Sequence, residues 1–254
     1  MDPKNKLWEE LHAFLLANGA SVVGCGSMSQ VPDSKRDGYP TGISIGVALD
    51  SSLIEGLLEG PSEAYRENAA SVRAGLMRLR HSCVDSLVGR GYQARFSRSE
   101  ITDEAHYMSD LPHKTVATRA GLGWIGKSAL LISERFGAAL RLTSVMTDAP
   151  LPAAQACDAS RCGSCEACAV HCPGKAIIGA NWQAGVDRAS MFLPAACDEA
   201  RTERSRAAGL SEARLCDVCI AVCPWTRRFV QRKKSRQAHA ADATGRAAEA
   251  LRSE

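Results

Sequence analysis

The sequence has no apolar run long enough to cross a bilayer, for which about 18 consecutive residues are needed. Its first residues, Met1-Asp2-Pro3-Lys4, lack the basic stub, apolar stretch and small-residue cleavage site of an export signal. Neither sign of charge dominates, because 31 Lys and Arg stand against 28 Asp and Glu, a net charge of +3 in 254 residues. We therefore expect a cytoplasmic protein with no membrane partner, and its 45% apolar residues provide a sizeable packed core.

Cysteine is the residue that the chain has in excess. Nine of its eleven cysteines lie between Cys157 and Cys223. An odd total without an export signal argues against a disulfide scaffold, and dense thiols in a reducing compartment indicate metal binding. The other two, Cys25 and Cys83, fall at the end of a predicted strand and on the apolar face of a predicted helix. We expect both of these thiols to pack in the core.

Two cysteine runs share one spacing pattern. The first has the spacing C-x2-C-x2-C-x3-C-P of bacterial ferredoxins that bind [4Fe–4S] clusters, and it reads Cys162-Gly-Ser-Cys165-Glu-Ala-Cys168-Ala-Val-His-Cys172-Pro173. The second repeats the ending as Cys216-Asp-Val-Cys219-Ile-Ala-Val-Cys223-Pro224, and Cys197 stands between the runs. In this pattern the fourth cysteine binds a different cluster from the first three.

The economical ligand assignment therefore crosses the runs and predicts two [4Fe–4S] clusters. Cluster one takes Cys162, Cys165, Cys168 and Cys223, and cluster two takes Cys172, Cys197, Cys216 and Cys219. The alternative, zinc, prefers two separated C-x2-C pairs and would leave the triple run and both Cys-Pro pairs unexplained. Cys157 is left over as a spare thiol near the clusters, and we expect His171 to tune or shield a cluster rather than to bind iron.

Hydrophobic periodicity organises the rest of the chain. Residues 4–18 are predicted as a helix whose inner face carries Leu7, Leu11, Phe14 and Leu15. A longer helix is predicted from Pro61 to Gly89, with an inner face of Tyr65, Ala69, Val72, Leu76, Leu79, Cys83 and Leu87. Strands are predicted at 21–24, 41–49, 93–96 and 138–146, with loop and helix over 110–127.

These elements predict an α+β fold. An α/β domain is expected over residues 1–150, a smaller ferredoxin-like double-cluster domain over 151–226 and a basic C-terminal tail over 227–254. The tail holds eight basic and three acidic residues, so it carries +5 and leaves −2 for residues 1–226. A solvated, Ala-rich terminal helix is the plainer interpretation of the tail, and contact with nucleic-acid phosphates is the alternative.

A glycine motif precedes the cysteines. The segment Gly121-Leu-Gly123-Trp-Ile-Gly126-Lys127-Ser128 matches the letters of the phosphate-binding loop G-x4-G-K-S, which requires a strand before it and a helix after it. Here the polar stretch before the motif favours a helix, and Ala129-Leu-Leu-Ile132 after it favours a strand. The order is reversed, which argues against nucleotide binding at this motif.

Four segments together resemble the epoxyqueuosine reductase family: Gly121–Lys127, Thr143-Ser-Val-Met-Thr-Asp148, the ferredoxin run and the closing Cys216–Trp225. The resemblance covers residues 111–148 and 162–225 and is diffuse over the first hundred residues. It implies a nitroreductase-like, corrinoid-binding domain with a double-cluster ferredoxin domain attached, and cobalamin held in the cleft between them. In the family, electrons pass through the clusters to cobalt, and the reduced cobalt removes an epoxide oxygen from a modified base in tRNA.

The resemblance also implies which residues lie at the cofactor. Carried over by position, the residues that face the corrinoid are Lys127, Ser128, Asp217 and Val218.

The family's proton-donating aspartate lies fourteen residues before the first glycine of the motif, and that position is Tyr107 here. Asp110, three residues later, is the candidate for the catalytic acid, while Tyr107 and His113 remain open. A turn aspartate before Pro112 is the plain alternative for Asp110.

Three functions remain to be distinguished. The first is a cobalamin- and cluster-dependent reductase, with epoxyqueuosine in tRNA as the candidate substrate. The second is a ferredoxin-type protein that passes electrons to a partner enzyme and has no substrate of its own. The third is a tRNA-binding protein that uses the basic tail. The first two require an electron donor such as ferredoxin or flavodoxin, and the sequence does not indicate an oligomeric state.

Overall fold

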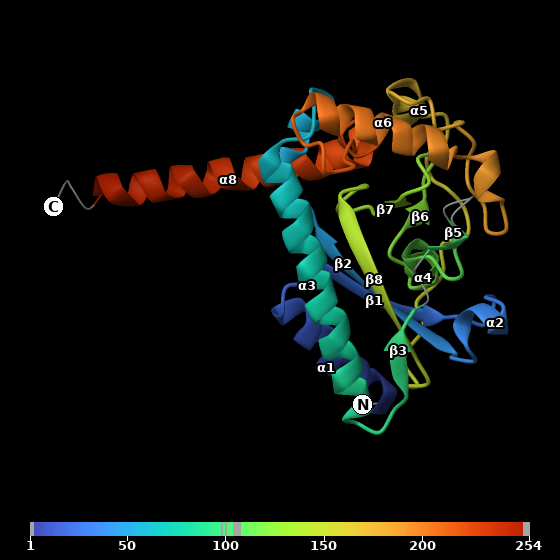
Figure 1. Ribbon diagram of the computed structural model, residues 1–254. Coiled ribbons are helices and arrows are strands. Elements are labelled where there is room, and N and C mark those ends of the chain that lie inside the picture. Colours follow the sequence, from blue (N-terminus) through green and yellow to red (C-terminus); the bar gives the residue numbers. More distant parts are fainter. Residues whose placement is uncertain (1–2, 98, 100, 104–107, 251–254) are drawn as a thin grey trace.

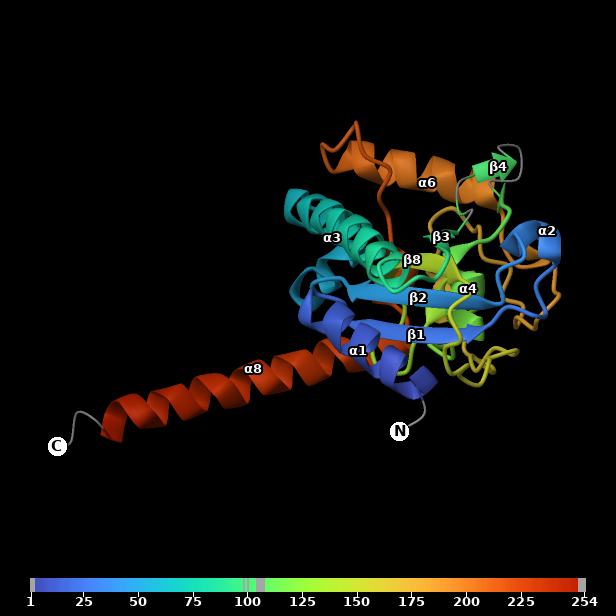
Figure 2. The same cartoon turned by 90° about the horizontal axis from the view of Figure 1, so that it is seen from below.

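A four-stranded antiparallel sheet organises the computed structural model, which describes residues 3–97, 99, 101–103 and 108–250. Its strands lie in the order β1-β2-β8-β3 (Figures 1 and 2). They are β1 Val22–Ser27, β2 Thr41–Ala48, β8 Leu140–Thr147 and β3 Ala94–Phe96. All four predicted strands are confirmed, and they form one sheet whose two central strands, β2 and β8, pair along their whole length.

Three helices pack on this sheet, and one of them, α4 (His113–Arg119), contacts β1, β2 and β8. Helix α3 (Glu63–Val88) crosses β2 and β8, and α1 (Pro3–Ala17) packs against β1. The predicted inner face of α3 is confirmed except that Ala69 is only half-buried. On α1 the prediction for Phe14 is wrong, because 42% of this residue is exposed. Trp8 and Leu7 pack with the buried Leu11 and Leu15 instead, so the inner face of α1 lies to one side of Phe14.

The remaining elements are short. The helices are α2 (Asp33–Arg36), α4 (His113–Arg119), α5 (Ala167–Val170), α6 (Pro194–Ala207) and α7 (Val218–Ala221), with 3-10 turns η1 (Ser51–Leu53), η2 (Glu55–Leu58) and η3 (Arg188–Ser190). Two small hairpins pair β4 (Ile101–Asp103) with β5 (Met108–Ser109) and β6 (Trp124–Ile125) with β7 (Leu131–Ile132). None of the helices in the described part of the chain is both long and apolar enough for a membrane crossing.

The cysteine-rich part shares a core with the sheet. Ile220, Ala221 and Cys223 belong to the same buried cluster as the residues of β2, β8 and α3. The last helix, α8 (Pro224–Ala250), adds Phe229 and Val230 to this cluster and then projects away from the body (Figures 1 and 2). The boundaries expected at residues 150 and 226 therefore fall within a continuous packed unit, and α8 runs across the second of them.

The start of α8 is held by the turn between β7 and β8. The hydroxyl of the buried Thr226 accepts a hydrogen bond from the Ala138 N–H at 2.9 Å. Gly137 has a φ of 58°, and a Cβ added to it would lie 2.2 Å from the Thr226 nitrogen. Only glycine permits this approach of two backbones.

We expect Gly137→Ala to lower the melting temperature more than Gly209→Ala, by a difference worth about 2 kcal/mol, or about 4–8 °C. Gly209 has a similar φ of 75° but nothing within 4 Å of an added Cβ, so it controls for backbone strain alone. Thermal unfolding of both variants without oxygen measures the difference. Equal melting temperatures would show that α8 does not dock as described.

Candidate functional site

Three thiols lie around that of Cys168. Burial and the neighbouring thiols of Cys162, Cys223 and Cys165 raise the pKa of Cys168 to about 11. We call these four residues thiol set one. They come from both cysteine runs, since Cys223 lies 51 residues beyond Cys172, the last cysteine of the first run.

Four other thiols gather beside them. Burial raises the pKa of Cys197 to about 11, with Arg201 opposing the rise and the thiols of Cys172 and Cys216 adding to it. Burial, the charge of Asp217 and then the thiols of Cys197 and Cys216 raise the pKa of Cys219 well above its usual range. We call Cys172, Cys197, Cys216 and Cys219 thiol set two.

The two sets are adjacent. The thiol of Cys168, in thiol set one, also contributes to the raised pKa of Cys219, in thiol set two. Within the described residues no group of three or more His, Cys, Asp or Glu is arranged to hold a single metal ion. The ligands of one zinc ion lie within about 2.3 Å of it, whereas the cysteines of a cubane bind four separate iron corners.

Helix starts present hydrogen-bond donors to the sulfurs. Cys223 directly precedes α8, and the N–H groups of Thr226 and Trp225 and the Thr226 hydroxyl lower the pKa of its thiol against the rise caused by burial. The N–H of Val218, where α7 begins, likewise lowers the pKa of Cys216 against burial. Because the N–H groups of a first helical turn have no partner within the helix, they stabilise negative charge and suit a thiolate.

The glycine motif lies against thiol set one. Helix α4 precedes the motif and β7 follows it, so the reversed order predicted from the sequence is confirmed. A Cβ on Gly126 would lie 2.6 Å from Ile132 Cγ1 and 3.4 Å from the Cys162 sulfur. The glycine therefore leaves room for Ile132 of β7, and the Cys162 sulfur lies at ordinary contact distance beside it.

The four residues expected at the corrinoid are not brought into one cavity. Lys127 and Ser128 are both 5% exposed, and the Lys127 amine has no hydrogen bond or ion pair among the described residues. Val218 is buried with Cys216 and Val222. Only Asp217 lines a large cavity.

Asp217 joins the sheet to thiol set two. Its Oδ2 accepts hydrogen bonds from the Tyr65 hydroxyl of α3 at 2.6 Å and from Arg141 Nη2 of β8 at 2.7 Å. Burial opposes ionisation, yet Arg141 and these hydrogen bonds hold the pKa of Asp217 below its usual range. Asp217 also has a left-handed φ of 55°, so the surroundings fix its backbone. The sequence pointed to Asp217 but gave no signal for its two partners.

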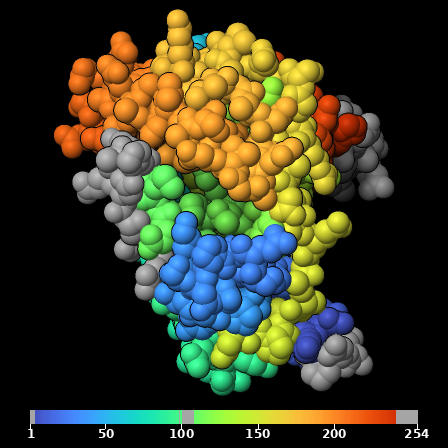
Figure 3. All heavy atoms as spheres, turned by 90° about the vertical axis from the view of Figure 1, so that its right-hand side faces the viewer, coloured from blue at the N-terminus to red at the C-terminus, as the bar shows by residue number. Residues whose placement is uncertain are grey.

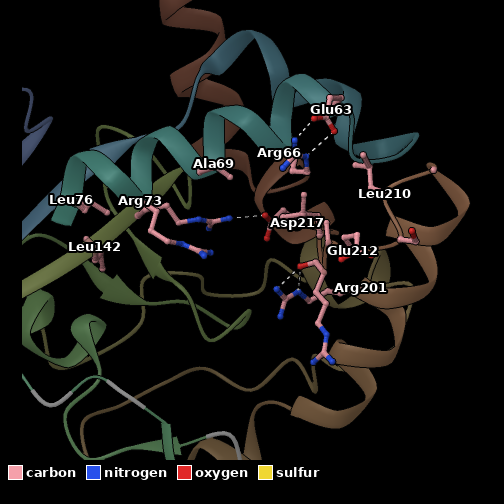
Figure 4. A pocket seen from close by; sticks show the side chains of 17 residues that line it. Glu63, Arg66, Ala69, Arg73, Leu76, Leu142, Arg201, Leu210, Glu212 and Asp217 are labelled. Atoms are coloured by element: carbon pink, nitrogen blue, oxygen red, sulfur yellow. Dashed lines mark hydrogen bonds and ion pairs between the residues drawn. The ribbon is translucent and has the colours of Figure 1, made fainter. Parts of the chain in front are cut away.

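The cavity beside Asp217 has a volume of about 930 Å³ and lies between α3, β8 and residues 209–217 (Figure 4). Five arginines line it, which are Arg66, Arg73, Arg141, Arg201 and Arg214, together with Glu63, Glu212 and Asp217. In Figure 4, Arg66 and Arg73 lie on α3, across the space from Arg201 and Glu212. The cavity is therefore polar and cationic, and it adjoins thiol set two through Asp217.

Asp110 lines a second cavity, of about 480 Å³. Its walls come from residues 30–35, from α4 and from residues 182–191 of the cysteine-rich part. Figure 3 shows the hollow between residues 30–35, in blue, and the cysteine-rich part, in orange, with green atoms inside it. Lys114 also lines it, donates a hydrogen bond to the Ala129 carbonyl at 2.8 Å, and has its pKa lowered to about 8 by burial and Arg188.

The three acid candidates differ in placement. Burial and Arg80 lower the pKa of His113 to about 4, and its Nδ1 lies 3.1 Å from the Ser144 hydroxyl. His113 is therefore a neutral, packed histidine at pH 7. Tyr107 lies outside the described residues. Among the described residues, Asp110 is the one of the three that faces a cavity.

The remaining singled-out residues take structural positions. Burial raises the pKa of both Cys25 and Cys83 to about 12, which confirms that they pack in the core. His171 is exposed, and its Nδ1 lies 2.9 Å from the Ala167 carbonyl. Cys157 is half-buried beside the core, and no described hydrogen bond joins it to another cysteine.

Comparison with known proteins matches residues 161–226 to the family described as a 4Fe-4S double cluster binding domain. An epoxyqueuosine reductase from Pseudomonas aeruginosa is 35% identical over 114 residues, 45% of this chain and 31% of the relative. The chain spans less than half the length of the curated relatives it matches.

Solved structures share the fold. A reductive dehalogenase whose structure suggests a mechanism for B12-dependent dehalogenation has a TM-score of 0.68 and 16% identity, covering 94% of this chain and 36% of its own. An epoxyqueuosine reductase with an epoxyqueuosine-modified tRNA-Tyr stem loop has a TM-score of 0.52 and 16% identity, covering 87% of this chain and 65% of its own. The predicted fold and the resemblance to epoxyqueuosine reductases are confirmed, and residues 161–226 form a domain for two [4Fe–4S] clusters.

We expect Arg141→Gln to destabilise the protein by about 2 kcal/mol at pH 8, because it leaves the Asp217 carboxylate buried without its cation. Arg141 is 30% exposed, which keeps the cost below that of a fully buried pair. In the native protein the low pKa of Asp217 stabilises the fold above about pH 4, and this contribution is lost as the pH falls through that pKa.

The loss of stability caused by Arg141→Gln should shrink as the pH is lowered from 8 toward 5, since protonation of Asp217 removes the unpaired charge. Thermal unfolding across this range measures it. The double variant Arg141→Gln/Asp217→Asn is the control and should recover part of the loss at pH 8. If the loss of stability does not change with pH and is the same in the double variant, the ion pair between Arg141 and Asp217 is contradicted.

Proposed function

We propose that this chain is an iron–sulfur oxidoreductase resembling epoxyqueuosine reductase, which passes electrons through two [4Fe–4S] clusters to a cobalamin that reduces a substrate. The observation that carries the proposal is the placement of two adjacent thiol sets against the core of the sheet, into which Cys162, Cys219 and Cys223 pack, beside a cavity of about 930 Å³. The clusters supply one-electron transfer when bound, and cobalamin supplies a reducing cobalt centre.

The ligands of each cluster follow from the two thiol sets. In this proposal thiol set one binds cluster one and thiol set two binds cluster two, as the crossed assignment predicts. The donors at Cys223 and Cys216 and the Ala176 N–H, 3.3 Å from the Cys172 sulfur, stabilise the thiolates and favour reduction of the clusters. Arg141 offsets the charge of Asp217 next to thiol set two.

The residues present suit a polar macrocycle such as cobalamin. The Lys127 side chain is 5% exposed and its amine makes no hydrogen bond or ion pair among the described residues, so the amine can donate to a ligand. The arginines beside Asp217 offer further donors to the side chains of a corrinoid. We assign Lys127, Ser128, Asp217 and Val218 to the corrinoid on the resemblance. Of these, Asp217 lines the cavity of about 930 Å³, whereas the other three are buried outside its lining.

Asp110 is the proposed proton donor for the reduced substrate. Its cavity lies between α4 and the cysteine-rich part, and Lys114 on the same wall provides a cation that titrates near neutral pH. Epoxyqueuosine in tRNA is the proposed substrate, because the relatives are named for this reaction and one solved relative carries a modified tRNA stem loop. Ferredoxin or flavodoxin is the proposed electron donor.

We expect Cys219→Ala, purified without oxygen, to lose about half of its iron, because thiol set two loses a ligand while thiol set one remains. Cys157→Ala is the matched control, since this neighbouring thiol belongs to neither set, and it should retain all of its iron. Iron and sulfide quantification with EPR measures both variants. Complete retention of iron in Cys219→Ala would contradict the crossed assignment.

Anaerobic protein incubated with cobalamin should retain the corrinoid on gel filtration, show cobalt and iron–sulfur signals, and deoxygenate an epoxyqueuosine-containing tRNA stem loop. Asp110→Asn should keep both signals and lose about 10²-fold or more in turnover, because the protonating group is removed. Ser109→Ala, at the neighbouring position, is the control. Intact clusters without cobalamin binding would instead support an electron-transfer protein with no substrate of its own.

A further inference from the structure

The root of α8 forms one wall of a groove that the proposed function does not use. The groove has a volume of about 650 Å³ and runs between α8, residues 48–51 and the turn of Arg135 and Phe136. Its apolar floor includes Leu49, Phe136 and Phe229. Its cations come from both sides: Arg135 from the β7–β8 turn, and Arg232, Lys233 and Arg236 from α8.

Among the described residues, none of these four cations forms an ion pair with a carboxylate. Asp50 is the acidic residue of the lining, and its Oδ1 already accepts hydrogen bonds from the Ser52 N–H at 2.9 Å and the Ser52 hydroxyl at 2.8 Å. Lys233 and Arg236 have no ion pair among the described residues, and Arg232 donates to the Arg135 carbonyl rather than to a carboxylate. By contrast, the adjacent Lys234 pairs with Glu55 at 2.5 Å outside this lining.

Packing fixes the geometry of the groove. Phe229 contacts Phe136 edge to face, with ring centroids 5.4 Å apart, and Val230 is buried in the core. The Arg135 guanidinium lies over the Phe136 ring, 5.0 Å from its centroid. The cationic side chains therefore project from a rigid base, which lowers the entropic cost of binding an anion.

We propose that this groove binds the phosphodiester backbone of an RNA. Arg232, Lys233 and Arg236 spread over about 6 Å of the helix axis, with Arg135 opposite, so they suit a row of phosphates better than one small anion. The identity of the RNA as a substrate tRNA rests on the proposed function, whereas the phosphate contact rests on the groove alone. The basic residues at the start of the tail thus act as one wall of a site that also needs Arg135.

The double variant Lys233→Glu/Arg236→Glu should weaken binding of a tRNA stem loop at least tenfold at about 100 mM salt, because it removes two phosphate contacts. It should also flatten the plot of log affinity against log salt by about 1.4–1.8. The matched control is Arg78→Glu/Arg227→Glu, which makes the same change in net charge at two exposed positions outside the groove. Fluorescence anisotropy across a salt series measures both, with iron content and circular dichroism confirming the fold.

Equal weakening by the two double variants would overturn the proposal, because net charge alone would then explain the binding. If Lys233→Glu/Arg236→Glu loses binding of pyrophosphate but binds RNA as the native protein does, the proposal is also overturned, and the groove is then a site for small anions. The measurement needs neither cobalamin nor turnover. If the native protein does not retain cobalamin, the RNA-binding result can therefore still be interpreted. Normal cobalamin binding by Lys233→Glu/Arg236→Glu shows that the two sites are separate.

Discussion

Each thiol set draws on both cysteine runs, so residues 162–172 and 216–223 must lie side by side before either set exists. This constraint folds the cysteine-rich part back on itself and brings α7 and the start of α8 against the sheet. Burial raises the pKa of these thiols, which opposes formation of the thiolates that iron requires. The helix-start donors and the energy of iron binding offset that cost, so cluster assembly and folding are coupled.

The same constraint explains why the expected division into domains does not separate two cores. Ile220 and Ala221 lie between cysteines of the second run and pack into the core of the first 150 residues. Asp217 adds a polar link at the same place, with one partner on α3 and the other on β8. The segment that carries thiol set two therefore has a rigid frame, because apolar packing and an ion pair hold the same few residues.

The sequence predicted what depends on local pattern. The four strands followed from alternation and α3 from its apolar face. The two cluster sites followed from the spacing of the cysteines, because the last cysteine of a C-x2-C-x2-C-x3-C-P run binds the cluster of the other run. It did not predict the contact of Tyr65 and Arg141 with Asp217, since residues 65, 141 and 217 meet only after folding and leave no local signature. Phe14 was misplaced for a related reason: helical periodicity shows that an apolar face exists, but the neighbour against which it packs decides its edges.

Gly126 shows that one sequence motif can meet two different structural requirements. In a nucleotide-binding loop, glycines let backbone N–H groups surround a phosphate. Here the absence of a side chain on Gly126 leaves space for Ile132 of β7, whose Cγ1 would lie 2.6 Å from an added Cβ, while the Cys162 Sγ at 3.4 Å would stay at ordinary contact distance. A substitution at this glycine that abolished function would thus resemble the loss of an ATP site, although the damaged contact would be the packing of the β6–β7 hairpin beside the ferredoxin loop.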